Sequence, residues 1–195
     1  RTTENTGFTS DSGPPSPVKV RWSFTTSEPI LSSPAVVGDR IYLATGDRRV
    51  VALERATGRL VWEYLTGVPS YASPAVAGDL VFFGLRDRRF IALDRETGTL
   101  RWEKDLGNPI LASAIVVDGT VFIGSTDKKL YALDAATGRE LWSFTKNGWI
   151  ISSVAYADNS VAVVSQDGVL HILEASTGRK RFTFRAGFPT MGGPA

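Results

Sequence analysis

The sequence predicts an all-β fold built from four-stranded antiparallel units, and three observations predict it. A stretch of eleven residues occurs four times at a constant spacing of 40 residues, starting at Ala52, Ala92, Ala132 and Ile172. Pairs such as Gly-Asp and Asp-Gly, which accept the positive φ of tight hairpins, interrupt the apolar runs of each repeat. No helical period of apolar residues is evident. Four-stranded repeats of about 40 residues are typical of a β-propeller, and an open β-solenoid is the alternative.

The first repeat shows how each unit divides into four strands. Its runs at 34–37, 41–44, 50–53 and 59–64 are separated by turn residues. The second run of the later repeats is apolar almost throughout, which is typical of a sheet buried on both faces, as between neighbouring blades. The first runs are rich in Ala, Val, Ser and Pro, which are small enough to crowd around a central axis.

The repeats divide the chain into segments. We expect an N-terminal extension (1–17), a lone outer strand (18–24), blades at about 31–66, 71–106, 111–146 and 151–186, and the start of a further blade (187–195). The strand at 18–24 matches a fourth strand without its first three, and 187–195 aligns with 67–75. We therefore expect a fragment, the N-terminal half of a seven- or eight-bladed ring. Closure with four blades and a dimer that completes the ring are the alternatives.

The composition is that of a globular protein and excludes several kinds of site. The chain has 195 residues, 43% of them hydrophobic, and its formal net charge of +2 is too small to predict nucleic-acid binding. It has no Cys and one His. Thiol chemistry and disulfides are therefore excluded, and too few residues remain for a Cys- or His-based zinc site. No apolar run approaches the roughly 20 residues of a membrane helix. These absences argue against most enzymes.

The repeated stretch carries a specific pattern, Ala-x-Asp/Glu-x-x-Thr-Gly-x-x-x-Trp. Three copies are complete, and the fourth has Ile172 and Phe182 at its first and last positions. The pattern resembles the tryptophan-docking motif of the pyrroloquinoline-quinone (PQQ)-like β-propeller superfamily, over about residues 18–195. This superfamily includes quinoprotein alcohol dehydrogenases, BamB-type scaffolds of the outer-membrane barrel-assembly machine and sensor domains of some bacterial kinases. The resemblance implies an extracytoplasmic location.

The aromatic residues of this motif are expected to join the blades. An indole on each outer strand can lie across the seam with the next blade, bury roughly 150–250 Å² and direct its N–H to a backbone acceptor. The glycine of each Thr-Gly pair supplies a left-handed turn residue. We assign structural docking roles to Trp22, Trp62, Trp102, Trp142, Phe182, Gly58, Gly98, Gly138 and Gly178. A platform that stacks on a sugar or cofactor is the alternative.

Candidate partner-binding residues lie in the turns before the third strands and in the connections between blades. The turns carry the basic pairs Arg48-Arg49, Arg88-Arg89 and Lys128-Lys129, and their period predicts one shared propeller face. The connections add Tyr71, Ile110 and Trp149. Apolar and aromatic side chains among Arg and Lys are typical of a protein-binding patch. Ordinary solvated turns, and connections packed beneath their own loops, are the alternatives.

Two further polar positions have structural interpretations. Ser33, Ser73, Ser113 and Ser153 begin the innermost strands, where they could line a channel or satisfy local turn amides. His171 takes the place that Ile91 and Tyr131 hold in other blades, so we interpret it as a packing residue of the third strand.

The sequence therefore favours a non-enzymatic propeller that binds or scaffolds a protein, with no cofactor, no nucleic-acid partner and no transmembrane segment. The alternatives are part of a PQQ-dependent dehydrogenase and a sensor or carbohydrate-binding propeller. The resemblance implies that such a dehydrogenase holds PQQ beside a vicinal Cys pair, with calcium on Asp, Glu or Asn, and Cys is absent here. Uncovered blade faces are expected to make the isolated chain self-associate.

Overall fold

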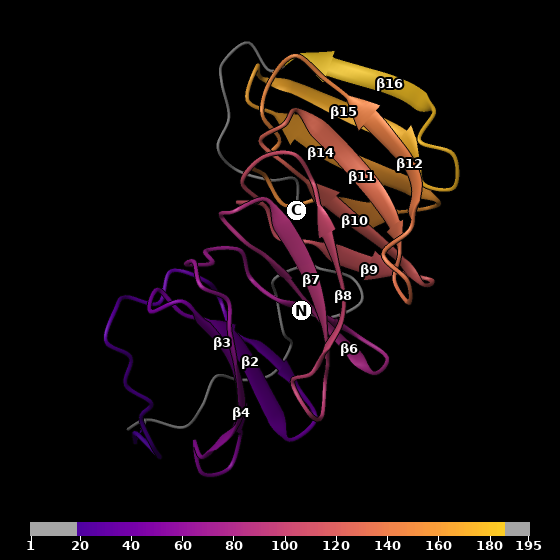
Figure 1. Cartoon of the computed structure of the whole chain (residues 1–195). Helices are drawn as coiled ribbons and strands as arrows, with labels where there is room; N and C mark the ends of the chain where they lie inside the picture. The colour runs from indigo at the N-terminus through magenta and orange to yellow at the C-terminus, as the bar shows by residue number, and fades with distance from the viewer. Residues whose placement is uncertain (1–18, 186–195) are drawn as a thin grey trace.

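The computed structural model describes residues 19–185, which form sixteen strands in four antiparallel sheets (Figure 1). Each sheet holds four strands in chain order, and we call the sheets blades 1 to 4. Blade 1 contains β1 (Ala35–Val37), β2 (Arg40–Ala44), β3 (Arg49–Glu54) and β4 (Leu60–Leu65). Blade 2 contains β5 (Ala75–Ala77), β6 (Leu80–Gly84), β7 (Arg89–Asp94) and β8 (Leu100–Asp105). Blade 3 contains β9 (Ile115–Val117), β10 (Thr120–Gly124), β11 (Lys129–Asp134) and β12 (Glu140–Thr145). Blade 4 contains β13 (Ala155–Ala157), β14 (Ser160–Ser165), β15 (Val169–Glu174) and β16 (Lys180–Arg185). The predicted all-β class with four-stranded antiparallel blades is confirmed.

The turns between first and second strands explain the regular register of the blades. In blade 1, Val37 pairs with Arg40 across a two-residue turn in which Gly38 has a φ of 59°. In blade 3 the same turn uses Asp118 at 47° and Gly119 at 74°. Two-residue hairpins of this kind need positive φ, which Gly, Asp and Asn accept at least cost.

The turns between third and fourth strands hold their conformation through a carboxylate. In blade 2, Asp94 accepts hydrogen bonds from the backbone N–H groups of Glu96 and Thr97 at 3.0 and 2.9 Å. The bond from the Thr97 amide is the main reason that the pKa of Asp94 is lowered to about 2, and the bond from the Glu96 amide adds to the effect. The pairing of the two strands then shifts register between Ala92 and Leu93. The shift is a β-bulge that bends the outer strand.

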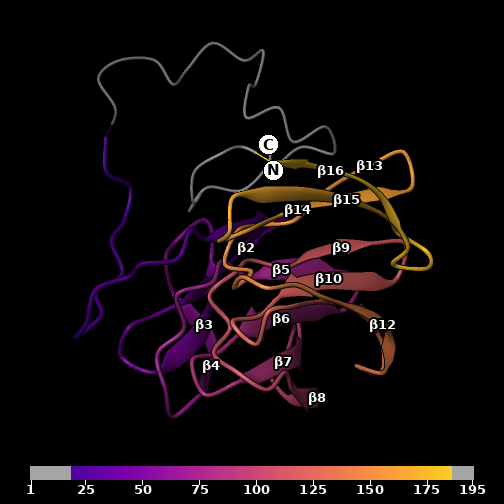
Figure 2. The ribbon, with the colours of Figure 1, turned by 90° about the horizontal axis from the view of Figure 1, so that it is seen from above.

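The hydrophobic core lies between blades rather than within a single sheet. Figures 1 and 2 show the blades following one another in chain order, from blade 1 at the indigo end to blade 4 at the yellow end, and the first strands of blades 1, 2 and 3 are neighbours. One buried cluster joins Tyr42 and Trp62 of blade 1 to Phe83 of blade 2, and the next joins Phe82 of blade 2 to Ile123 of blade 3. The middle strands of blades 2 and 3 therefore have both faces buried, which explains their largely apolar sequences. In blade 4, burial alternates along β14 and β15.

The segment predicted as a lone outer strand is not part of a sheet over its described residues, 19–24. A fourth strand needs a third strand beside it for its backbone hydrogen bonds, and none is present there. The side chains of Trp22 and Phe24 still pack against the buried residues Leu43 and Val51 of blade 1. The extension at 1–17 and the further blade expected at 187–195 lie outside the described residues. Between residues 19 and 185 there is no helix that could cross a membrane.

Candidate functional site

The indole groups of the repeated motif join each blade to the one that follows it. Each indole N–H donates to a backbone carbonyl 33 residues further along the chain. The pairs are Trp22 with Arg55 at 2.9 Å, Trp62 with Arg95 at 2.9 Å, Trp102 with Ala135 at 3.0 Å and Trp142 with Ala175 at 2.9 Å. One indole bond is thus repeated at four seams, counting the seam between the 19–24 segment and blade 1.

The glycines of the motif lie under the same indoles. Gly98 has a φ of 73°, and a Cβ added to it would lie 2.6 Å from Cδ2 of Trp62. Gly58, Gly138 and Gly178 lie in the same way under Trp22, Trp102 and Trp142. One face of each indole is therefore covered by protein, which leaves that face unavailable for stacking on a ligand. Phe182, the fifth aromatic residue of the series, is 60% exposed.

The partner-binding candidates lie on one face of the propeller, which we call the loop face. It consists of the turns 45–49, 85–89, 125–129 and 165–169 and the connections 25–33, 66–73, 106–113 and 146–153. In an antiparallel blade, the turn from second to third strand and the exit from the fourth strand lie at the same end of the sheet.

The structure separates the two members of each basic pair. Arg48, Arg88 and Lys128 are exposed, whereas Arg49, Arg89 and Lys129 are half-buried. The three exposed residues have φ values of 66°, 81° and 76°, in the left-handed region that non-glycine residues seldom adopt. The pairs therefore do not form one uniform basic rim.

The half-buried arginines are neutralised within their own blades. Arg49 bonds Asp47 at 2.7 Å and Glu63 at 2.8 Å. The Arg49 guanidinium is the main reason that the pKa of Asp47 falls to about 2, and the hydroxyl of Thr45 lowers it further. Asp47 and Glu63 in turn raise the pKa of Arg49.

The same arrangement recurs in blade 2 and changes in blade 3. Arg89 pairs with Asp87 at 2.7 Å, a bond that raises the pKa of this arginine. In blade 3, Asp127 accepts instead from the backbone N–H of Lys129 at 2.9 Å and from the hydroxyl of Tyr131 at 2.5 Å. Burial, followed by the bond to Asp127, raises the pKa of Tyr131.

The apolar candidates divide into exposed and buried residues. Trp149 is 47% exposed, and Tyr71 is half-buried beneath Arg86, whose guanidinium carbon lies 5.2 Å from the ring centre. Ile110, predicted as a partner contact, is completely buried, so the structure corrects this assignment. Its side chain fills the space above Gly84, where any Cβ would collide with it. The glycine at the end of the second strand was the sequence signal for this packing.

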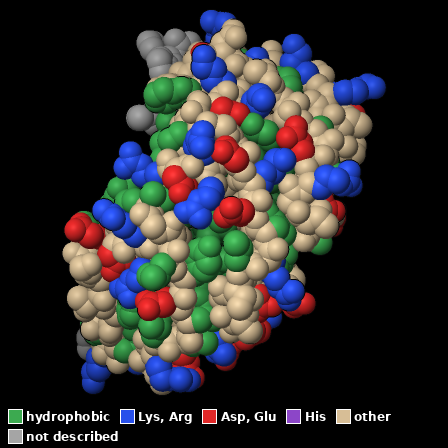
Figure 3. Space-filling view, in the orientation of Figure 1, with side chains coloured by type: hydrophobic (Ala, Val, Ile, Leu, Met, Phe, Trp, Pro, Cys, Tyr) green, Lys and Arg blue, Asp and Glu red, His purple; other side chains and the backbone are tan. Residues whose placement is uncertain are grey.

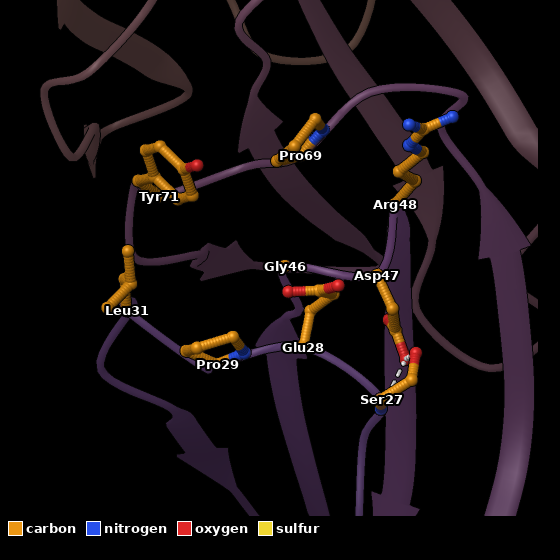
Figure 4. A pocket seen from close by; sticks show the side chains of 9 residues that line it. All are labelled: Ser27, Glu28, Pro29, Leu31, Gly46, Asp47, Arg48, Pro69 and Tyr71. Atoms are coloured by element: carbon orange, nitrogen blue, oxygen red, sulfur yellow. Dashed lines mark hydrogen bonds between the residues drawn. The ribbon is translucent and has the colours of Figure 1, made fainter.

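A shallow pocket of about 500 Å³ lies on the loop face over blade 1 (Figure 4). It is lined by Ser27, Glu28, Pro29, Leu31, Gly46, Asp47, Arg48, Pro69 and Tyr71. Figure 4 shows Tyr71 and Leu31 on one side and Arg48 and Asp47 on the other. The Gly46 N–H donates to the Pro29 carbonyl at 3.2 Å, which holds the connection against the turn. The sequence candidates Arg48 and Tyr71 thus come together, whereas Glu28, Pro29 and Pro69 had no signal beyond their place in the connections.

The serines just before the first strands bridge blades 1, 2 and 3. The backbone N–H of Ser33 donates to the Ser73 hydroxyl at 3.1 Å, and that of Ser73 donates to the Ser113 hydroxyl at 3.0 Å. His171 is 1% exposed and packs at 5.6 Å from the ring of Phe144. Within residues 19–185 neither of its ring nitrogens has a hydrogen-bond partner. Burial is the main cause that lowers its pKa to about 4, and Lys146 adds to the effect.

The calcium that accompanies PQQ has no cluster of carboxylate ligands among the described residues. Calcium needs several oxygen ligands converging on one point. Between residues 19 and 185, no three His, Asp or Glu side chains lie close enough together to hold a metal ion. The turn carboxylates at 54, 94, 134 and 174 are in separate blades.

Solved structures with this fold include BamB, quinohemoprotein alcohol dehydrogenases and a designed protein. BamB from Moraxella catarrhalis superposes with a TM-score of 0.80 at 22% identity, covering 89% of this chain and 58% of that one. Quinohemoprotein alcohol dehydrogenase ADHIIG from Pseudomonas putida HK5 gives 0.73 at 20% identity, covering 83% of this chain and 35% of that one. The computationally designed Ika8 protein gives 0.69 at 17% identity, covering 76% and 47%. The chain thus spans little more than half the length of BamB, and these likenesses show the fold alone.

Sequence comparison identifies the family. A search of curated proteins found no match. A family model described as outer membrane protein assembly factor BamB matches twice, over residues 15–116 and 92–192. The two matches together cover almost all of the chain, including every repeat of the tryptophan-docking motif. The chain therefore belongs to this BamB-like family of PQQ-like repeat propellers.

Proposed function

We propose that the chain is a non-enzymatic scaffolding propeller that binds a protein partner through the loop face. The observation that carries this proposal is the composition of that face, where exposed cations stand beside exposed apolar side chains. Arg48 and Lys128 project from the turns, while Leu31 is 64% and Trp149 47% exposed in the connections. Large apolar groups with arginine nearby are the residues that dominate protein interfaces.

The charge distribution over the two ends of the propeller supports the choice of this face. The loop face carries eight Lys or Arg side chains against five carboxylates. The opposite end, formed by residues 38–40 and 54–59 and their equivalents in the other blades, carries nine carboxylates against six arginines. The space-filling view shows how closely cationic, acidic and hydrophobic groups are interspersed on the side that it presents (Figure 3). Such a difference between ends orients a charged partner during its approach.

The family supports a scaffold role and an extracytoplasmic location. The family model is described as an outer membrane protein assembly factor. This description refers to protein assembly and not to an enzymatic reaction. The similarity to quinohemoprotein alcohol dehydrogenases favours a second candidate, a segment of a PQQ-dependent dehydrogenase. These two candidates differ in whether the propeller must hold a cofactor.

Site-specific photo-crosslinking tests the proposal. A benzoylphenylalanine at position 31 samples the loop face, and the same residue at Ala136, an exposed position of the opposite end, is the control. In the cells that naturally produce the protein, we expect position 31 to yield one reproducible protein adduct and position 136 to yield none. Adducts from position 136 alone, or from neither position, would contradict the proposal. Dye-linked alcohol oxidation after addition of PQQ and calcium would instead support the dehydrogenase.

A further inference from the structure

Three of the exposed cations of the loop face occupy a backbone position that is better suited to glycine. Arg48, Arg88 and Lys128 are at equivalent places in blades 1, 2 and 3, with φ values of 66°, 81° and 76°. Blade 4 has Gly168 at this place, with a φ of 76°. The turn is therefore the same in all four blades, and the fourth blade shows that glycine fits it.

A side chain at this position costs stability, because a left-handed conformation brings Cβ close to the following carbonyl group. The fold gains little in return. The carbonyl groups of Arg48, Arg88 and Lys128 accept backbone bonds from Thr66, Leu106 and Lys146 at 2.8–3.0 Å, which a glycine carbonyl would accept equally well. Of the three side chains, only that of Arg88 makes an ion pair within residues 19–185, with exposed Asp105 at 3.3 Å. Exposed pairs of this kind contribute little.

Each turn carboxylate is held by groups of its own blade, and the exposed cation is the charged side chain that the turn presents to solvent. Asp47 is bonded by Arg49, Asp87 by Arg89, and Asp127 by the amide of Lys129 and the hydroxyl of Tyr131. The neighbouring left-handed residue in each turn points its cation to solvent. A strained residue that adds little to the stability of the fold is typical of a functional surface.

We infer that the loop face binds an acidic polypeptide segment that also carries apolar side chains, and that Arg48, Arg88 and Lys128 are its charge contacts. This inference rests on the proposed function and specifies the chemistry of the partner. The apolar groups decide between a polypeptide and another polyanion. Leu31 and Tyr71 line the pocket beside Arg48, and Trp149 lies in the connection after blade 3, so apolar contacts accompany the cations. The aliphatic side chain of Leu31 would have little to contact on an anionic polysaccharide.

Substitution by glycine separates binding from folding. The variant Arg48→Gly/Arg88→Gly/Lys128→Gly removes three cations and relieves the backbone strain, so its Tm is expected to equal or exceed that of the unchanged protein. The probe is a fluorescein-labelled peptide that alternates Glu with Leu or Tyr, followed by fluorescence anisotropy. We expect saturable binding that weakens at high salt, and a Kd about tenfold higher for the triple variant. The charge-matched control is Arg59→Gln/Arg139→Gln/Arg179→Gln, three exposed arginines at the opposite end.

Two competing probes complete the test. The inference would be overturned if the two triple variants raised the Kd of the peptide equally, or if neither variant changed it. Tighter binding of heparin or phosphatidylglycerol vesicles than of the peptide would also overturn it, in favour of a polyanion or a membrane. If crosslinking from position 31 still identifies a protein partner, the proposed function survives that result and only the acidic-segment inference fails.

Discussion

The indole of Trp62 lies directly on Gly98 of the next blade, 2.6 Å from the point where a Cβ on that glycine would be. The same indole donates its N–H to the carbonyl of Arg95 at 2.9 Å. A single side chain thus fixes both the distance and the direction between two blades. Because the contact repeats along the chain, it sets the geometry of every described seam.

Gly98→Ala should destabilise the protein by roughly 3 kcal/mol, since it adds backbone strain and a collision with Trp62. Gly78→Ala is the matched control, because Gly78 also has positive φ, 54°, but no atom within 4 Å of its Cβ position. Its cost should be roughly 1 kcal/mol. Urea unfolding followed by tryptophan fluorescence measures the difference, and equal losses in the two variants would show that the indole contact is dispensable.

Ile110→Ala should cost roughly 2–4 kcal/mol, because it leaves a cavity above Gly84. The adjacent Leu111→Ala should change the free energy of unfolding by only about 0.5 kcal/mol, as is usual for a surface residue. Crosslinking yield from position 31 should be the same in both variants under conditions where both are folded. A stable Ile110→Ala protein that no longer forms the adduct would restore Ile110 as a partner contact.

The buried imidazole of His171 should make the protein sensitive to mild acid. Its pKa is lowered to about 4 in the folded chain, by burial and by Lys146 and Lys180 against the opposing effect of Asp167. The unfolded chain, with the ordinary value near 6.5, binds the proton first. The stability that this group contributes is therefore complete above about pH 6.5 and is lost as the pH falls through 4.

Replacement of this residue provides the test. His171→Ile introduces the residue that blade 2 has at Ile91, and it should remove a loss on the order of 3 kcal/mol between pH 7 and 4. Unfolding free energies of both proteins across this range give the comparison. Parallel curves would mean that the imidazole titrates alike in the folded and unfolded states.

The outer strand of blade 4 should promote self-association. Phe182 and Phe184 of β16 are 60% and 64% exposed, and adjacent exposed aromatic groups favour contact between molecules. We expect dimers or larger species in analytical ultracentrifugation, and a shift toward monomer in Phe182→Ser/Phe184→Ser. Leu65→Ser, which removes another exposed apolar residue, should leave the distribution unchanged. A double variant that associates as before would place the contact elsewhere.

Much of the site could be predicted from the sequence, because the repeat relates each residue of one blade to its counterpart in the next. The period alone placed Arg48, Arg88 and Lys128 on one face, since equivalent residues of equivalent blades occupy equivalent positions. Ile110 escaped the same reasoning. Its burial depends on Gly84, whose missing side chain is the local signal, but only the structure shows that Ile110 fills that space.

By itself the sequence determined the all-β class, the four-stranded blades and the family, because strand alternation, turn residues and the docking motif are local features with a fixed period. Only the tertiary structure decided which cation of each basic pair faces solvent. Backbone conformation and the reach of Asp47 and Glu63 make that choice, turning Arg49 inward and Arg48 outward. Two charged residues that are adjacent in sequence can therefore differ in whether their side chains are available to bind a partner.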